Sequence, residues 1–409
     1  MRVKKRKKKD TLFNFFAPKF LTTACILTIY ILGSSIPMPL GNTVAEAKSN
    51  YIMQLASSAT GGNLTNLTLM SMGLGPYMVV MILWTVLTMI KPLGLGNLSE
   101  KESGYVKNLI ILIVSVIQAV GIVLNFNLKL SFMHKAGVVC ILLAGGFLII
   151  YLSTINGSKG VGGMMLIMLF GIISNIGKQA SVAFKMISKN PNAVLITAII
   201  VLVILLLIIL SVLMERSEYR IPVTQVLINN DLNKESYIPI KPNASGGMAI
   251  MFAMSFFMII SYILQIIAKH HPASWLKGFE KGVTMFSMPG ATIYVVLLFL
   301  LSIVFGFVNI DAGKIAEGLR NSGDYIKGVR PGRDTKRYIN KYVWFFSILG
   351  AIYISIIAGG PLYLGVLFPQ YKRIVMLPGM ALMCVGMIFT TQDQIRAGKS
   401  LYSYKKWIK

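Results

Sequence analysis

The stretch "GGNLTNLTLMSMGLGPYM", residues 61–78, contains an apolar segment that is too short to cross a membrane. Its core, residues 64–72, would reach only about 14 Å as a helix, roughly half of a bilayer's hydrocarbon core. Glycines and a proline at 73–76 then allow the chain to break before a new helix starts. The segment therefore predicts either a re-entrant loop that packs against its neighbours or a movable plug that enters a cavity from outside.

The rest of the chain has the composition of a membrane protein. Of its 409 residues, 55% are hydrophobic and only 13% are charged, whereas soluble domains carry about 25% charged residues. The formal net charge of +26 is confined to short connectors between apolar runs. This distribution indicates anchoring against an anionic membrane face and contact with acidic partners, rather than a nucleic-acid-binding domain.

Windows of about 20 apolar residues predict ten spanning helices. They cover residues 20–38, 74–90, 105–126, 136–154, 162–180, 192–213, 246–268, 288–309, 342–362 and 374–391. With the N-terminus inside, 29 of the 40 Lys and Arg residues fall on that side and 11 on the other. The positive-inside rule therefore places both termini in the cytoplasm, together with the loops 214–245 and 310–341.

Ten spans divide into five and five, and an odd number in each half forces the second half to insert upside down relative to the first. The predicted fold is an all-α membrane protein with ten transmembrane helices in two inverted five-helix halves. Its expected parts are a basic cytoplasmic tail over 1–19, an N-terminal half over 20–185 with the plug at about 61–73, a C-terminal half over 186–392 and a cytoplasmic tail over 393–409.

A weak echo between the halves supports the repeat. "GLGPYMVVM" at 73–81 and "SGGMAIMFAM" at 245–254 each place glycines, which loosen a helix start, before a methionine-rich face.

The basic start "MRVKKRKKKD" and the apolar run after it could also be read as a signal peptide, with "AEA" at 45–47 as the cleavage site. The run from 20 to 40 is longer than the apolar region of a signal peptide, which has about 7–15 residues. We therefore expect a retained first span. The basic residues of 2–9 most simply bind anionic lipid.

Several kinds of chemistry are not indicated. The centres of the predicted spans contain no Lys, Arg, Asp, Glu or His, which proton-coupled transporters and intramembrane proteases need. Cys25, Cys140 and Cys384 lie in apolar runs without metal-binding spacing, and the three histidines have no partner pattern. "KGVGG" at 159–163 lacks the GK[ST] of a phosphate-binding loop. No catalytic residue, metal or cofactor is expected.

Four motifs, in this order along the chain, resemble the SecY family of protein-conducting channels. They are "ILGSSIPMP" at the end of the first span, "GG…LTLMSMGLGPYM" leading into the second, "RIPVTQ" followed by "YIPIKPNASGGMAIMFA", and "AEGLRNSGDYIKGVRPGRDTKRYI". The resemblance covers residues 30 to about 340, and within the family it is strongest to the accessory channel of Gram-positive bacteria.

The chain departs from the usual family pattern at several positions. Ala249 replaces a proline, Val79 and Met81 replace serines on the gate side of the second span, "PGMA" replaces a glycine–threonine pair and "GVGG" replaces a longer glycine turn. These departures from the family pattern favour a channel that exports a specialised substrate over one that exports secreted proteins in general.

The resemblance implies an hourglass pore that is closed by a plug helix and by a ring of aliphatic side chains at its waist. The plug would be Leu64, Thr65, Asn66, Leu67, Thr68, Leu69, Met70, Ser71 and Met72. Carried over by motif, the ring would be Leu74, Met78, Met164, Met168, Met251, and Met383 or Cys384. An apolar constriction resists ion leakage by dewetting, and flexible methionines can reseal around varied chains. For any single methionine the alternative is ordinary packing in a membrane helix.

The resemblance also implies a lateral gate between spans 2–3 and spans 7–8, through which apolar signal segments leave for the lipid. Gln118 matches a polar gate position. The alternative is that Gln118 makes an ordinary hydrogen bond between helices.

The loop "KGVRPGRDTKRY", residues 327–338, is basic and is framed by glycine and proline. Proline fixes the backbone and glycine allows the turn, so the loop is predicted to project as a stiff finger whose arginines bind carboxylates or RNA phosphates. The family uses Arg330 and its neighbours to couple to a cytosolic motor or a ribosome. The implied docking residues are Arg330, Arg333, Lys336 and Arg337, with Arg216 and Arg220 from loop 214–245. The alternative is that these residues only obey the positive-inside rule.

The implied function is that of the central channel subunit of an accessory Sec protein-export system in the bacterial plasma membrane. It would pass unfolded polypeptide, expected to be serine-rich glycosylated surface adhesins, driven by a SecA-type motor ATPase. Other implied partners are small membrane subunits, accessory secretion proteins, the secreted preprotein and anionic lipid, with no nucleic acid other than ribosomal RNA.

Two rival functions stay open. A secondary transporter or flippase with inverted repeats would need a polar site at the middle of the membrane, and a polytopic enzyme such as an acyltransferase would need a His/Asp or Ser/Lys cluster near one face.

Overall fold

The computed structural model describes residues 12–38, 57, 59–62, 64, 67–89, 94–95, 98–126, 131–188, 193–225, 236–243, 245–270 and 282–407. Within these residues the chain is built from helices and one short β-hairpin. The long helices are α1 (Leu12–Ser35), α3 (Gly75–Met89), α4 (Glu100–Asn125), α5 (Phe132–Lys159), α6 (Gly163–Ile187), α7 (Ala193–Arg216), α8 (Met248–His270), α10 (Met288–Asn309), α12 (Arg333–Ile354) and α15 (Leu377–Trp407). The short helices are α11 (Ala312–Ser322), α13 (Gly360–Leu367), α14 (Lys372–Val375) and a 3-10 turn at Pro369–Tyr371.

Each of the ten predicted spans coincides with one of the long helices, so the chain is a multi-pass membrane protein. Among the described residues, nine helical stretches are long and apolar enough to cross a bilayer, and the apolar helix Gly75–Thr88 is shorter. A π-helical turn, Ser355–Gly359, joins α12 to α13, so the predicted span 342–362 runs through a helix of changed pitch. The count of ten crossings depends on α3 and stays a prediction.

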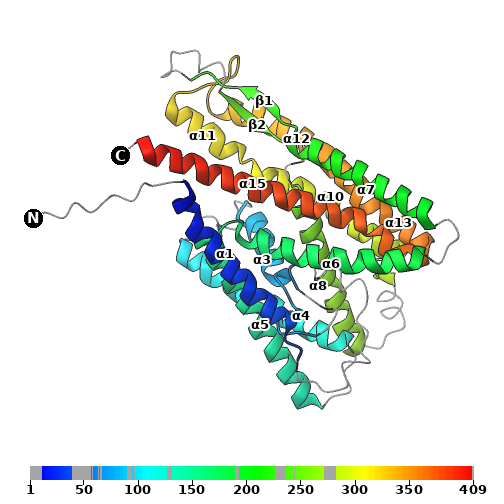
Figure 1. Ribbon diagram of the computed structural model, residues 1–409. Helices are drawn as coiled ribbons and strands as arrows, with labels where there is room; N and C mark the ends of the chain where they lie inside the picture. The colour runs from blue at the N-terminus through cyan, green and yellow to red at the C-terminus, as the bar shows by residue number, and fades with distance from the viewer. Residues whose placement is uncertain are drawn as a thin grey trace, which may run out of the picture.

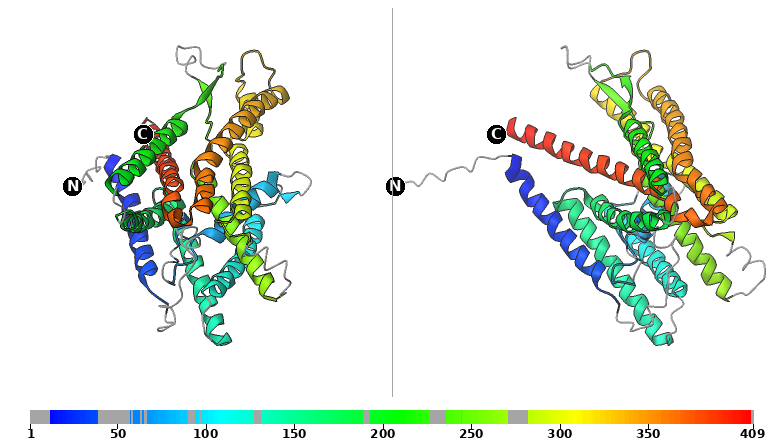
Figure 2. Two further views of the ribbon diagram at one scale, coloured as in Figure 1. Left: turned by 90° about the vertical axis from the view of Figure 1, so that its right-hand side faces the viewer. Right: turned by 45° about the vertical axis from the view of Figure 1, so that its right-hand side comes forward.

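The helices form two groups. Figure 1 shows α1, α3, α4 and α5 on one side of the molecule and α7, α10, α12 and α15 on the other, and Figure 2 shows the same division from two further directions. Helices α6 and α8 contact members of both groups: α6 packs on α5 and α15, and α8 packs on α4 and α10. The start of α1, the end of α15 and the β-hairpin lie toward one end of the molecule, which we call the hairpin end.

Local side-chain bonds explain where several helices begin. Ser99 and Glu102 form a reciprocal capping box at the start of α4. The Ser287 hydroxyl accepts a hydrogen bond from the Gly290 amide at the start of α10, which also carries a proline in its first turn. The Asp311 carboxylate accepts from the amides of Gly313 and Lys314, and α11 therefore starts directly after α10 ends.

The interior consists of two apolar clusters. The main apolar cluster contains buried side chains from the plug segment, α3, α4, α5, α6, α8, α10 and α15. The second, which we call the hairpin cluster, lies at the hairpin end and comprises Ile221, Val223, Ile240, Ala312, Ile326, Ile339 and Val343.

The hairpin cluster shows that the two predicted cytoplasmic loops are folded together. Strands β1 (Tyr219–Pro222) and β2 (Tyr237–Ile240) pair antiparallel inside loop 214–245, which differs from the predicted all-α fold. Loop 310–341 contains α11 and the start of α12. The Tyr219 and Tyr342 rings stack with their centroids 4.9 Å apart, and this contact fastens the hairpin to α12.

Candidate functional site

The predicted plug is a chain of turns in the residues that the structure describes, not a helix. Residues 67–74 form turns and one isolated bridge, while Thr65 and Asn66 lie outside the described residues. The Thr68 amide donates to the Ser71 Oγ at 2.7 Å, and the Ser57 hydroxyl donates to the Ser71 carbonyl at 2.7 Å. Short polar side chains that bind nearby backbone in this way compete with helix formation. The predicted helical conformation is therefore wrong for this part of the plug.

The plug segment is bonded to the end of the first span. The Met38 amide donates to the Leu67 carbonyl at 2.9 Å, and the Leu69 amide donates to the Ile36 carbonyl at 3.3 Å. These two bonds surround the isolated bridge between Pro37 and Thr68. Two motifs that the sequence shows 30 residues apart are therefore neighbours in space.

Three glycines on flanking helices let the plug approach closely. A Cβ added to Gly145 of α5 would lie 1.8 Å from the Leu69 carbonyl oxygen. At Gly146 it would lie 2.1 Å from the Met72 methyl group, and at Gly33 of α1 it would lie 2.3 Å from the Met70 methyl group. Contacts this short do not occur in folded proteins. The Leu69 carbonyl is a backbone group, so position 145 requires glycine, whereas the methionine methyl groups that face positions 146 and 33 can rotate aside.

The two ends of the plug segment are joined to each other and to α1. The Leu74 amide donates to the Thr60 carbonyl at 2.8 Å, and Gly73 between them has a φ of 65°, which favours glycine. The Tyr30 hydroxyl donates to the Gly61 carbonyl at 2.6 Å. The described residues of 57–74 are buried, apart from the half-buried Leu69, and these bonds join the two ends of the segment.

The predicted ring residues lie in or against the main apolar cluster. Leu74, Met78, Met168, Met251 and Met383 are at most 1% exposed, while Met164 and Cys384 are partly buried against the cluster. They come from α3 or the residue before it, and from α6, α8 and α15. The turn before α8 meets α15 backbone to backbone there, since a Cβ on Gly247 would lie 2.6 Å from Met383 Cα and one on Gly386 would lie 2.3 Å from the Gly247 nitrogen.

The echo between the two halves has a counterpart in backbone geometry. Gly73 before α3 and Gly246 before α8 both have positive φ, 65° and 51°. Each therefore turns the chain into a helix that carries a predicted ring methionine, Met78 in α3 and Met251 in α8.

Gln118, the predicted gate residue, contacts the plug. Its side chain is 5% exposed, and its Nε2 donates to the Met72 carbonyl at 3.5 Å. The sequence analysis missed the side chains that join α4 directly to α8. A Cβ on Gly121 would lie 2.3 Å from the Tyr262 ring, and the Asn125 side-chain amide donates to the Gln265 side-chain oxygen. The one signal in the sequence is that Asn125 and Gln265 are polar residues, at the same depth, in two otherwise apolar helices.

The predicted docking residues are all exposed at the hairpin end. Gly328 and Gly332 have φ values of 82° and 100°, so the glycines turn the chain as predicted, and the Thr335 hydroxyl donates to the Arg330 carbonyl at 2.8 Å. Because α12 begins at Arg333, three of the docking residues lie on its first turns and not in a loop, namely Arg333, Lys336 and Arg337.

The two arginines beside the hairpin have different surroundings. The Arg220 guanidinium pairs with Glu218 at 2.7 Å and lies 4.6 Å from the Tyr237 ring centroid. The hydrogen bond from Arg220 lowers the pKa of the Glu218 carboxyl below its usual value. Arg216, at the end of α7, lies 5.6 Å from the Phe389 ring of α15.

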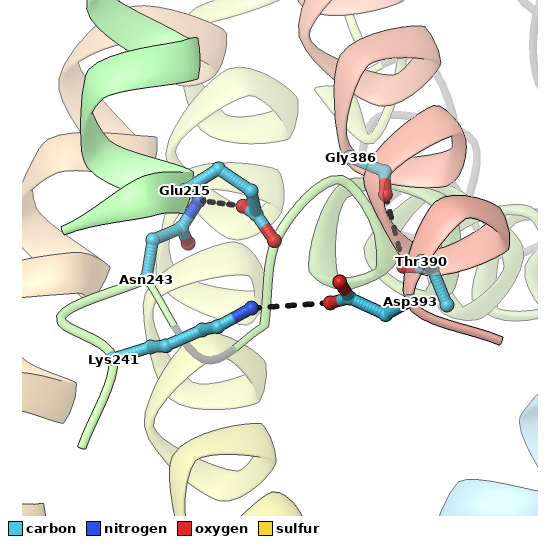
Figure 3. A network of polar contacts seen from close by, with 6 residues as sticks. All are labelled: Glu215, Lys241, Asn243, Gly386, Thr390 and Asp393. Atoms are coloured by element: carbon cyan, nitrogen blue, oxygen red, sulfur yellow. Dashed lines mark hydrogen bonds and ion pairs between the residues drawn. The ribbon is translucent and has the colours of Figure 1, made fainter. Parts of the chain in front are cut away.

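A polar network lies at the base of the hairpin, between α7, α8 and α15 (Figure 3). The Asn243 side-chain amide donates to the Glu215 carboxylate at 3.2 Å, and the Lys241 ammonium pairs with Asp393 at 3.3 Å. Glu215 is only 8% exposed although it lies one residue from the end of α7. The sequence predicted no role for Glu215, Asn243 or Asp393.

No metal centre is visible in the part of the chain that the structure describes, where no group of three or more His, Cys, Asp or Glu side chains is placed to hold an ion.

The comparisons with known proteins agree with this geometry. The SecY family matches residues 68–392. The chain is 34% identical to the accessory Sec system protein translocase subunit SecY2 of Streptococcus gordonii over 93% of this chain and 96% of that protein.

Two solved structures share the fold. One is described as the structure of a protein conducting channel, with a TM-score of 0.68 at 17% identity over 98% of this chain and 95% of the other. Another comes from work on the plug domain of SecY and the membrane seal, with a TM-score of 0.63 at 16% identity and the same coverage. The matched range and the identity to SecY2 show that the chain belongs to the SecY family of protein-conducting channels.

Proposed function

We propose that the chain is the channel subunit of an accessory protein-export system and passes unfolded polypeptide across the plasma membrane of a bacterium. The observation that carries the proposal is the buried plug segment, described at 57, 59–62, 64 and 67–74. It ends at Leu74 among the ring candidates and is bonded to α1, to the residues just after α1 and to α4. A loop held this way fills space between helices without crossing the membrane, as a plug must.

The ring candidates complete the resting seal. Leu74, Met78, Met168, Met251 and Met383 approach from four helices and the end of the plug segment, and their surroundings are apolar. A constriction lined with such side chains excludes water and ions, yet methionine can rearrange around a passing chain. In this proposal Met164 and Cys384 form the partly buried margin of the ring.

The hairpin end would face the cytoplasm and receive a SecA-type motor ATPase, which supplies the energy. Exposed Arg330, Arg333, Lys336 and Arg337 would bind carboxylates on the motor, with Arg216 and Arg220 as a second contact. Both termini would lie on the same side. Anionic lipid would contact the basic tail 2–9.

Other subunits would cover the exposed apolar helices. The span Thr197–Arg216 of α7 is only 6% buried in its most apolar window, so lipid or small membrane subunits of the translocon must cover it. In this proposal the exported substrate would be a large, serine-rich, glycosylated adhesin, and accessory secretion proteins would assist its passage.

The test is reconstitution of the purified chain in lipid vesicles, with a SecA-type motor and a labelled unfolded preprotein on the outside. We expect ATP-dependent protection of the preprotein from protease and little ion flux at rest. Deletion of 64–72 should raise resting ion flux. Flux of a small solute without preprotein transport would support a transporter instead, and equal resting ion flux with and without the plug would contradict the channel proposal.

A further inference from the structure

Glu215 is a buried carboxylate that the sequence analysis did not consider. It is 8% exposed, and its Oε2 accepts a hydrogen bond from the Asn243 Nδ2 at 3.2 Å. A carboxylate removed from water is costly unless it is hydrogen-bonded. The bond to Asn243 therefore constrains both residues more strongly than a surface contact would.

The position of this bond in the chain is informative. Glu215 precedes strand β1 and Asn243 follows strand β2, so their bond joins the two legs of the hairpin at its base. Beyond the bond, Arg216 is exposed at the end of α7 and Arg220 is exposed on strand β1 of the hairpin. The Tyr219–Tyr342 stack connects the hairpin to α12, whereas this base connects it to α7, α8 and α15.

On the other side of the bond, the chain enters α8 through a tight turn. The Ser245 hydroxyl donates to the Asn243 side-chain oxygen at 3.3 Å and lies 3.1 Å from the Ser302 hydroxyl of α10. Gly246 has a φ of 51°, and a Cβ there would lie 3.4 Å from both carboxylate oxygens of Glu215. The carboxylate is thus packed directly against the turn that sets the direction of α8.

The same turn contacts two more helices. A Cβ on Gly247 would lie 2.6 Å from Met383 Cα in α15, and a Cβ on Gly350 of α12 would lie 2.2 Å from the Pro242 carbonyl. Because these contacts are with backbone atoms, rotation of a side chain cannot absorb a shift of the turn. Such a shift therefore changes the position of α8 relative to α15. Those two helices carry Met251 and Met383.

An ion pair also connects the hairpin base to α15. Lys241 pairs with Asp393 at 3.3 Å, beside the Glu215–Asn243 bond (Figure 3). The side chains are 37% and 49% exposed, and exposed ion pairs contribute little to stability. The Lys241–Asp393 pair therefore helps to orient the hairpin base, while the buried Glu215–Asn243 bond holds it in place more strongly.

We propose that Glu215 is a positioning residue that couples the hairpin to α8 and α15, so that a partner docked on the hairpin shifts the helices that carry Met251 and Met383. The proposal rests on the proposed function, in which the hairpin receives the motor and these methionines belong to the constriction. It predicts a defect in transport rate and not in motor binding.

The experiment compares Glu215→Gln with Glu215→Leu in the full chain, reconstituted with motor and preprotein. Both variants remove the negative charge, but glutamine keeps an oxygen that accepts from Asn243. Two quantities are measured, the motor concentration at half-maximal transport and the transport rate at saturating motor.

For Glu215→Leu we expect a loss of about tenfold in the saturating rate, which corresponds to one lost hydrogen bond to a charged group. The half-saturating motor concentration should stay unchanged. Glu215→Gln should match the parent in both quantities. A general structural role would lower binding and rate together, and that result would overturn the proposal, as would equal defects in both variants or a normal rate in Glu215→Leu.

If Glu215→Leu does not accumulate in the membrane, the exposed pair provides the test. Lys241→Ala and Asp393→Ala should each lower the saturating rate by about twofold, and the double variant should be no slower than either single one, because the two residues act as a pair. No loss in either variant, or losses that multiply, would overturn the coupling.

The two proposals fail separately. If reversing the charge of Arg330 leaves the half-saturating motor concentration unchanged, docking at this end is wrong. In that case, a lower saturating transport rate in Glu215→Leu but not in Glu215→Gln would still show that the hairpin base positions α8 and α15.

Discussion

The carbonyl oxygen of Leu69 in the plug segment occupies the position that a Cβ atom on Gly145 would take. A Cβ on Gly145 would lie 1.8 Å from that oxygen, so α5 and the plug segment are fitted backbone to backbone. The same helix offers a control, because a Cβ on Gly137 meets nothing within 4 Å.

Replacement of Gly145 by alanine should therefore displace the plug and open the resting seal. We expect resting ion flux to rise several-fold, since a contact with backbone atoms cannot be relieved by rotating a side chain. Planar-bilayer recordings of the purified variant measure this flux. Gly137→Ala adds the same methyl group in the same helix and should behave like the parent. Equal recordings for the two variants would show that the plug does not depend on this contact.

The apolar constriction predicts a second class of leak. Substitution of Met78, Met164 and Met251 together by serine should raise resting ion conductance, because polar side chains let water enter a narrow apolar passage. Met133→Ser, at a site 78% exposed, is the control for replacing a methionine by serine. Steady conductance in the parent that the triple substitution leaves unaltered would rule out a seal at these residues.

Charge reversal at Arg330 tests the docking surface. Arg330→Glu should leave membrane insertion intact, because the side chain is exposed, but should abolish export by repelling the carboxylates of the motor. Pulse-labelling of the exported protein measures this loss, and membrane fractionation measures insertion. Arg320→Glu makes the same charge change at an exposed position of α11 and should export normally. Export at the full rate by Arg330→Glu would refute the docking role.

The contact between α4 and α8 predicts where the two halves separate. The halves are continuous in the chain between α6 and α7, whereas Asn125 of α4 and Gln265 of α8 meet through a side-chain hydrogen bond. Joining these positions through introduced cysteines with a short thiol-specific cross-linker should stop export, and cleavage of the linker should restore it. The native cysteines at 25, 140 and 384 are first replaced by serine.

Single-cysteine versions of the same two positions, treated with the same reagent, provide the control for that experiment. They should export normally, because neither can bridge α4 to α8. Undiminished export in the cross-linked double variant would mean that this contact stays closed during transport.

Much of the architecture follows from the sequence alone. Span positions depend on local length and hydropathy, and the helices α1, α3 to α8, α10, α12 and α15 coincide with the predicted windows. The turns around Gly328 and Gly332 were also predicted from a local pattern, a basic loop framed by glycine and proline, and both residues have a positive φ. The family motifs around the plug and the hairpin end also needed no coordinates.

Only the tertiary structure decided how the plug segment folds and what holds it. Its length is compatible with a helix, but its bonds go to Met38, Ser57 and Gln118, and its tightest contact is with Gly145. None of these partners can be recognised from periodicity, because they belong to separate helices and turns. Long-range main-chain bonds outweigh local helix propensity in a segment this short.

The hairpin and its base are the second feature that tertiary structure decided. Strands of four residues are too short to stand out in sequence, and they become stable only by packing Ile221 and Ile240 into the hairpin cluster. Glu215 looks like a surface residue at a helix end. It is buried because the turn before α8, which begins thirty residues later in the chain, folds back over it, and such a closure depends on contacts that no local pattern records.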